Sequence, residues 1–72
     1  MITARRKEIE QQLSSRELEI VRLMALGKAW AQIAIDLKIS VLTYDEHRKN
    51  IRNKLGLQSH ADWARALIPF LD

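Results

Sequence analysis

The residues that start and stop helices constrain this chain most, because they divide it into short segments. Ser14, Ser40 and Ser59 each precede a helix-favouring run, where a serine hydroxyl can accept a hydrogen bond from the first turn. The only two glycines, Gly27 and Gly56, each follow such a run, where glycine readily adopts the left-handed conformation that ends a helix. These predicted helix starts and ends indicate an all-α domain of four short helices.

Apolar residues recur at helical spacing within these segments and give each helix an inward face. The first helix starts with a capping box, in which Ser14 is followed three residues later by Glu17. It ends at Gly27. We expect its inward face to hold Leu18, Ile20, Val21, Leu23, Met24 and Ala25.

The second helix is shorter and ends near Lys38, after which Ile39 turns inward. Its predicted inward residues are Ile33, Ala34 and Leu37. Only a few residues separate it from the next helix, which suggests a helix-turn-helix corner. A plain helical bundle with a tight corner is the alternative.

The third helix is predicted from about Val41 to Leu55, with Leu42, Ile51 and Leu55 directed inward. The fourth begins after Ser59 and ends before Pro69, because the residue preceding a proline is disfavoured in the helical region. Its first turn carries Asp62, a favourable charge at a helix N-terminus.

The polar segment before Leu13 has Ile9 as its apolar anchor, and we interpret it as a short leading helix or an arm. Arg5 and Arg6 could reach into a DNA groove from such an arm, although we favour a solvated, disordered charge cluster over that interpretation. The predicted organisation is an arm or helix over 1–12, a helical domain over 13–68 and a tail over 69–72.

Length and composition exclude several classes of protein. With 72 residues and no cysteine, the chain has room for one small domain and lacks a disulfide framework or a thiolate zinc site. It shows neither a membrane-spanning apolar run nor a secretory signal, so we expect a cytoplasmic protein.

Catalytic and ligand-binding motifs are not evident in the sequence. His47 and His60 are too far apart, and too poorly accompanied, to suggest a metal site. Neither a glycine-rich phosphate loop nor a serine elbow is found. We therefore expect no enzyme activity, no cofactor, no metal and no small-molecule ligand.

The balance of charges favours a polyanionic partner. Twelve basic against nine acidic residues give a net charge of +3 and a sequence pI near 9.7. Such a surface suits nucleic acid, although a solvated basic surface remains an alternative.

The order of these segments resembles the LuxR-type, or GerE-like, helix-turn-helix domain of bacterial transcription regulators. The resemblance covers residues 13 to 67 and is carried by five blocks in the expected order: Leu13-Ser14-Ser15-Arg16-Glu17, Ile20 to Ala25 with Gly27, Gln32-Ile33-Ala34 with Leu37 and Ile39-Ser40, Thr43 with His47 and Asn50-Ile51, and Lys54-Leu55-Gly56-Leu57. It implies double-stranded DNA as the partner, with the helix at about 41–55 in the major groove. It also implies a homodimer formed through the fourth helix.

Candidate DNA-binding residues follow from this resemblance, position by position. The Thr43 hydroxyl would meet a phosphate, and residues 44, 45, 46 and 49 would face base edges. Asn50, Arg52 and Lys54 would lie near the DNA backbone. The complete set is Gln32, Thr43, Tyr44, Asp45, Glu46, Arg48, Lys49, Asn50, Arg52 and Lys54.

The chain departs from the family pattern at positions that matter for DNA binding. Tyr44-Asp45-Glu46 replaces the usual Val-Lys after the threonine, and Ala29 and Ala31 replace a serine cap and a lysine. A carboxylate is repelled by phosphates but can accept a hydrogen bond from cytosine. Asp45 could also pair with the cations three and four residues later. These acids could therefore weaken DNA binding or retune it.

Apolar residues that are predicted to be exposed suggest a second hypothesis, in which the domain binds another protein. Leu26 and Trp30 flank the first corner, at positions that the family normally leaves polar. A predicted dimer or partner interface comprises Trp30, Asp62, Trp63, Arg65 and Ala66, with Trp63 also expected to pad the core. The alternative function is a protein-interaction module with weakened DNA binding, such as an anti-activator that binds another transcription regulator.

Overall fold

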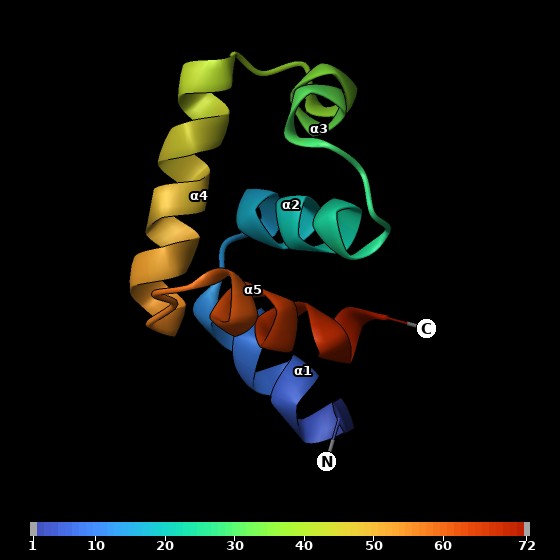
Figure 1. The fold of residues 1–72 in the computed structure, drawn as a ribbon, viewed down its shortest axis with the longest axis vertical. Helices are drawn as coiled ribbons and strands as arrows, with labels where there is room; N and C mark the ends of the chain where they lie inside the picture. The colour runs from blue at the N-terminus through green and yellow to red at the C-terminus, as the bar shows by residue number, and fades with distance from the viewer. Residues whose placement is uncertain (1, 72) are drawn as a thin grey trace.

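The chain forms five α-helices and one 3-10 turn in a computed structural model that describes residues 2–71, with side chains from residue 5 onward. The described part contains no strand, in agreement with the predicted all-α class. In chain order the elements are α1 (Ile2–Gln12), α2 (Ser15–Ala25), α3 (Trp30–Leu37), α4 (Val41–Leu55), α5 (His60–Leu67) and η1 (Ile68–Phe70) (Figure 1).

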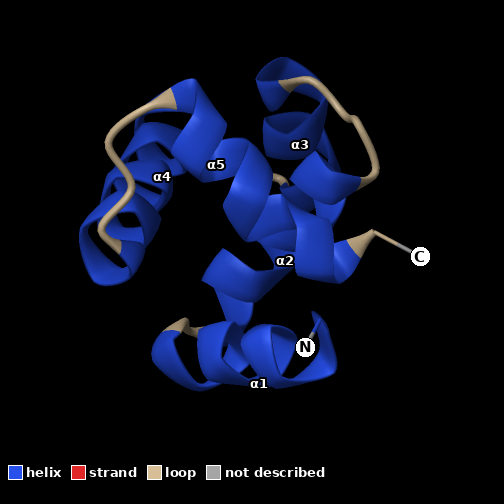
Figure 2. Cartoon of the chain, turned by 60° about the horizontal axis from the view of Figure 1, so that its bottom comes forward, coloured by secondary structure: helices blue, strands red, loops and turns tan. Residues whose placement is uncertain are grey.

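Helix α2 is the centre of the fold, because it packs against α3, α4, α5 and η1. Figure 1 shows α3 and the start of α4 at one end of the molecule and α1 at the other. The view in Figure 2 places α1 beneath α2, on the side away from α3. Every described helix is too short or too polar to cross a lipid bilayer.

The predicted N-terminal caps are confirmed. The Ser14 hydroxyl accepts from the Glu17 N–H, and a Glu17 oxygen accepts from the Ser14 N–H, which completes the capping box. Ser40 and Ser59 cap α4 and α5 in the same way, by accepting from the N–H three residues later. Helix α3 starts at Ala29 without a side-chain cap, so its first turn depends on tertiary packing.

The C-terminal caps include one that the sequence did not signal. Gly27 and Gly56 adopt left-handed φ angles of 86° and 68°, as predicted. Lys38 also adopts one, with φ 57°. Its N–H and that of Ile39 donate to carbonyls of the last turn of α3, which directs the chain sharply from α3 into α4.

The core combines residues from every helix and from η1. Ile20, Ile33 and Ile51 are fully buried, which confirms the predicted inward faces of α2, α3 and α4 at those positions. The buried apolar set is Ile9, Leu13, Ile20, Val21, Ile33, Ala34, Tyr44, Ile51, Leu57, Trp63, Ala66 and Phe70. Leu18, Leu23, Met24, Ala25, Leu37, Ile39, Leu55 and Leu67 pack against this set while remaining partly exposed.

The expectation that Leu42 points inward is wrong, since its side chain is 80% exposed. Nine residues separate Leu42 from the buried Ile51, or about two and a half turns, so the two side chains lie on opposite faces of α4. Tyr44 stands two turns before Ile51 and occupies the inward position instead.

The leading segment is a helix that packs on the domain. Ile9 is 1% exposed, and the Arg6 guanidinium lies 5.3 Å from the centre of the Phe70 ring. Helix α1 also packs against η1 and α4. The structure thus places Arg5 and Arg6 on an ordered helix rather than on an extended arm or in a disordered cluster.

Candidate nucleic-acid interface

The corner between α3 and α4 exposes two hydroxyls at the start of α4. Ser40 Oγ accepts from the Thr43 N–H at 3.1 Å and donates to Thr43 Oγ1 at 3.0 Å. Because the Thr43 oxygen serves as the acceptor in that pair, its own proton stays available for an outside acceptor. The hydroxyl that is predicted to contact a phosphate is therefore exposed and has a proton that it can donate.

The solvent face of α4 carries most of the predicted DNA-binding residues. It lies opposite the buried residues Tyr44 and Ile51. The exposed side chains on it and at its borders are Leu42, Thr43, Asp45, Glu46, Lys49, Asn50, Arg52 and Asn53. Asn53 was not among the predicted site residues, although its spacing of four residues from Lys49 places it on the same face.

Two of the predicted basic residues have partners within the protein. The Arg48 guanidinium lies 4.9 Å from the centre of the Trp63 ring, in a cation–π contact between α4 and α5. Lys54 donates to Glu17 Oε1 at 2.7 Å, which joins α4 to α2. Lys49 and Arg52 form no ion pair with any residue that the structure describes.

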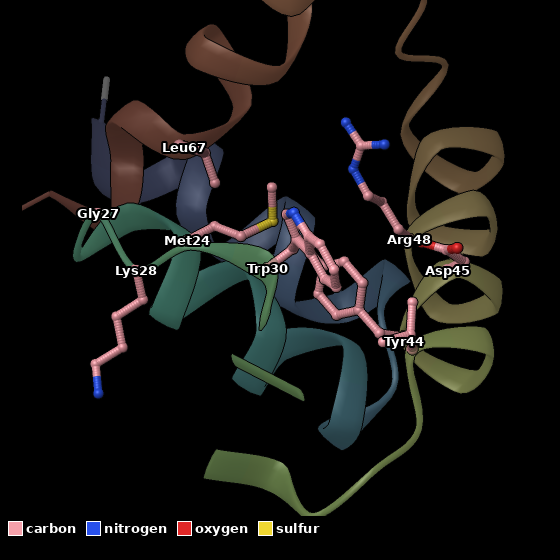
Figure 3. A pocket seen from close by; sticks show the side chains of 9 residues that line it. Met24, Gly27, Lys28, Trp30, Tyr44, Asp45, Arg48 and Leu67 are labelled. Atoms are coloured by element: carbon pink, nitrogen blue, oxygen red, sulfur yellow. The ribbon is translucent and has the colours of Figure 1, made fainter. Parts of the chain in front are cut away.

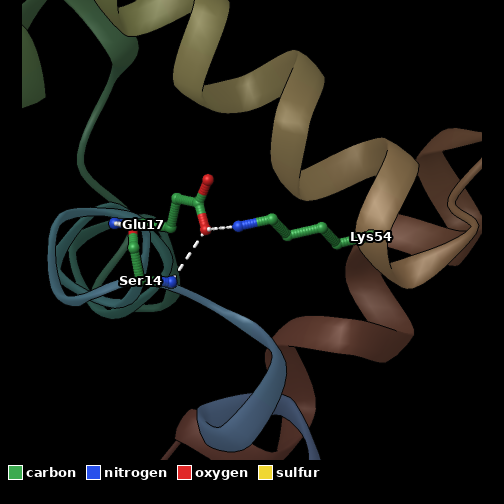
Figure 4. A network of polar contacts seen from close by, with 3 residues as sticks. All are labelled: Ser14, Glu17 and Lys54. Carbon is green, nitrogen blue, oxygen red and sulfur yellow. Dashed lines mark hydrogen bonds and ion pairs between the residues drawn. The ribbon is translucent and has the colours of Figure 1, made fainter.

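Glu17 is the only buried charged residue among those described, and its surroundings keep it ionised. Burial alone would raise the pKa of its carboxyl, but hydrogen bonds from Lys54 and Ser14, together with the Lys54 charge, outweigh that effect and lower the pKa. Figure 4 shows both bonds converging on one carboxylate oxygen. The contact gives Lys54 a structural role, which the sequence analysis had not anticipated.

Tyr44 does not face base edges, contrary to the expectation from the sequence. Its side chain is 4% exposed and belongs to the core. Burial raises the pKa of its phenol, with the Arg48 charge opposing the effect and Asp45 adding to it. The tyrosine fills the inward position of the first turns of α4, so it positions this helix against the core.

Asp45 does not form the predicted ion pairs with Arg48 and Lys49. Among the described side chains, neither cation lies within ion-pair distance of it. In Figure 3 its carboxylate points away from the Arg48 guanidinium. Asp45 therefore does not hold Arg48 or Lys49 in an ion pair.

Helix α3 holds its polar residues in a local network. Asp36 accepts from Lys28 and from the predicted DNA-binding residue Gln32, each at 2.8 Å. These hydrogen bonds, that from Lys28 first, lower the pKa of Asp36. This bond uses one N–H of the Gln32 amide and leaves its second N–H and its Oε1 available for an outside partner.

The predicted partner interface is only partly available on the surface. Trp63 and Ala66 are 8% and 3% exposed, so their side chains belong to the core and the prediction that they meet a partner is wrong. Asp62 accepts from the Gln58 N–H and from Arg65, and these bonds lower its pKa. The exposed residues of α5 are instead His60, Ala61, Ala64 and Arg65, with Ile68 adjoining them.

Trp30 stands at the edge of an open groove of about 630 Å³ between α2, α3, α4 and α5. Figure 3 shows its indole beside Tyr44, with Met24 and Leu67 on the opposite side. Trp30 remains 54% exposed and its neighbour Leu26 is 74% exposed. The lining of the groove thus combines apolar side chains with the charged residues Lys28, Asp45 and Arg48.

The described residues contain no group of three or more His, Asp or Glu side chains close enough to hold a metal ion. His47 is half-buried on α4 and His60 is exposed at the start of α5.

Comparison with known proteins identifies the family. Residues 11–67 match the bacterial regulatory proteins of the LuxR family. Relatives include the oxygen regulatory protein NreC from Staphylococcus aureus strains JH9, JH1 and Mu3, each 49% identical over 47 residues. That alignment covers 65% of this chain and 22% of each relative, and no solved structure matches. The chain belongs to the LuxR family of bacterial regulatory proteins, as a DNA-binding helix-turn-helix domain of the kind that regulates transcription.

Proposed function

We propose that the domain recognises specific sequences in duplex DNA by inserting α4 into the major groove. The observation that carries this proposal is the solvent face of α4, where Lys49 and Arg52 have no ion-pair partner among the described residues. The Thr43 hydroxyl stands beside that face with its proton available. Together these groups supply phosphate contacts that orient the helix and side chains that reach base edges.

Arg52 is best placed for the DNA backbone, because it lies at the border of the solvent face rather than at its centre. Helix α3 would cross the phosphates next to it, as in other helix-turn-helix domains. The charge that α4 presents is modest, because Asp45 and Glu46 offset part of it. We therefore expect weak binding to mixed-sequence DNA and a shallow dependence on salt.

We further propose a two-fold dimer through α5. Its exposed Ala61 and Ala64 have small side chains that let two helices approach closely, while Ile68, 47% exposed, supplies apolar area at one end. Ala64→Glu would place two carboxylates against each other across such an interface. It should leave the monomer folded and abolish the dimer in sedimentation analysis.

Fluorescence anisotropy on mixed-sequence duplex DNA, measured across a salt series, tests the DNA-binding proposal. The logarithm of the binding constant should fall by about 0.9 per phosphate contact as the logarithm of salt concentration rises. Arg52→Gln should reduce that slope by about 1. Lys7→Gln removes an equal charge from α1, away from the corner between α3 and α4, and should leave the slope unchanged. Absence of binding at about 50 mM salt would contradict the proposal.

The exposed groove beside Trp30 favours a second candidate function, namely binding to another transcription regulator. Leu26 and Trp30 present exposed apolar surface beside the turn between α2 and α3, outside the buried core. Exposed aromatic residues often anchor protein interfaces. Trp30→Ala would abolish capture of such a regulator under this candidate. Ile35→Ala, also exposed on α3, should leave it intact.

A further inference from the structure

Four side chains form a single row along the solvent face of α4, and we propose that this row determines which bases the domain prefers. The row consists of Leu42, Glu46, Lys49 and Asn53, all exposed. Their spacings of four, three and four residues align them on one helix face. The inference rests on the proposed function, because only a helix in the major groove brings such a row to base edges.

The row is directed away from the domain, as a base-reading surface must be. Tyr44 and Ile51 anchor the opposite side of α4 in the core, with 4% and 0% of their surfaces exposed. The row therefore follows the middle of the solvent face. Arg48 and Lys54 are set aside by their contacts with Trp63 and Glu17.

Leu42 opens the row in the first turn of α4. Its 80% exposure shows that it does not stabilise the core, and the first residues of a recognition helix are those that reach base edges. The one prominent apolar group in the major groove is the methyl group of thymine. Leu42 is thus suited to a T·A pair.

Glu46 follows one turn later and supplies a hydrogen-bond acceptor. No described cation lies within ion-pair distance of its carboxylate. The donors in the major groove are the amino groups of cytosine and adenine, and adenine carries its N7 acceptor next to that amino group. A carboxylate is repelled by N7, so Glu46 favours cytosine.

Lys49 completes the part of the row nearest the start of the helix. Its ammonium donates only, and guanine offers two acceptors in the major groove, O6 and N7. Leu42 and Lys49 are seven residues apart, or about 10 Å along the helix, which corresponds to about three base pairs. The preferred half-site therefore combines a thymine methyl, a cytosine amino group and a guanine within about three adjacent pairs.

Selection of bound sequences from a randomised duplex library tests this pattern. The unmodified chain should enrich sites with a fixed cytosine. Glu46→Gln should lose that preference on the order of tenfold and shift it toward adenine, whose N6 and N7 match a glutamine amide. Glu19→Gln removes an exposed acid from α2 and is the matched control, which should select the original site. An unchanged cytosine preference in Glu46→Gln would overturn the inference.

The thymine contact has an independent test in the DNA itself. Replacing the selected thymine with deoxyuridine deletes only its methyl group, which should weaken binding by the unmodified chain several-fold. The same replacement should have no effect on Leu42→Ala. An equal loss in both proteins would overturn the Leu42 assignment. Binding to mixed-sequence DNA without any enriched site would overturn the inference but keep the proposed function, whereas absence of all DNA binding would overturn both.

Discussion

Lys54, in the last turn of α4, donates from its ammonium to Oε1 of Glu17, in the first turn of α2, across 2.7 Å. The same oxygen accepts from the Ser14 N–H at 2.8 Å. One carboxylate therefore caps the central helix and fixes the far end of the candidate recognition helix. This coupling links the stability of the domain to the orientation of its candidate DNA-binding face.

Replacing Lys54 with Met should lower the free energy of unfolding by about 1 to 2 kcal/mol, because it leaves a buried carboxylate with fewer donors. The partial exposure of Lys54 keeps the loss in that range. Urea denaturation followed by circular dichroism measures it. Lys49→Met removes an exposed lysine from the same helix and should leave the unfolding free energy unchanged. Equal losses in the two variants would contradict a structural role for Lys54.

Acid should weaken the domain through Glu17. Its pKa is lower in the folded state than in the unfolded chain, so its contribution is present above about pH 4.3, the ordinary glutamate pKa. It is lost as the pH falls through the lower, folded-state value. Urea titrations at about pH 7 and about pH 3 should show a larger acid-induced loss for the unmodified chain than for Glu17→Gln. Asp36 and Asp62, whose pKa values are also lowered, contribute equally to both proteins, so equal losses would contradict this role of Glu17.

The left-handed cap at Lys38 predicts a stabilising substitution. A non-glycine residue at φ 57° carries a steric cost, and Lys38→Gly should raise the free energy of unfolding by roughly 0.5 to 1 kcal/mol. Gly56→Ala is the converse change. An added Cβ would meet no atom within 4 Å there, so its expected loss of about 1 kcal/mol would come from the backbone alone. Thermal melts of both variants provide the measurement, and destabilisation by Lys38→Gly would refute the interpretation.

Helix α1 should prove necessary for stability, even though the family match begins at residue 11. Ile9 is 1% exposed, and Ile9→Ala should cost about 2 to 4 kcal/mol through lost burial and a residual cavity. Ile35→Ala is the same change at a position that is 67% exposed, with an expected cost below about 0.5 kcal/mol. Chemical denaturation compares the two, and a negligible effect of Ile9→Ala would show that α1 is dispensable.

Local features of this fold were predictable from the sequence, because they depend on residues a few positions apart. The serine caps, the Ser14–Glu17 capping box and the two glycine ends are of this kind. The sequence did not show which face of α4 is buried, because Leu42 and Tyr44 are both residue types that can occupy a core position. Burial of Tyr44 resolves that ambiguity only once α2 and α3 pack against α4.

Tertiary partners of charged residues were beyond sequence reasoning. Glu17 and Lys54 are 37 positions apart, and Arg48 reaches Trp63 on another helix. Neither contact follows from helical spacing. Both cations had been predicted to contact DNA. Their contacts within the protein reduce the candidate DNA-binding cations of α4 to Lys49 and Arg52.

The packing of α1 against η1 has a consequence for how the domain forms during synthesis. Arg6 and Ile9 belong to α1 and are synthesised before α2 to α5, whereas Phe70, over whose ring Arg6 lies, follows α5. The backbone hydrogen bonds of α4 are local, but a helix of this length depends on tertiary packing for stability, and the hydrophobic core closes only after Phe70 has emerged from the exit tunnel. A nascent chain should therefore acquire a stably oriented α4 only after translation has passed Phe70.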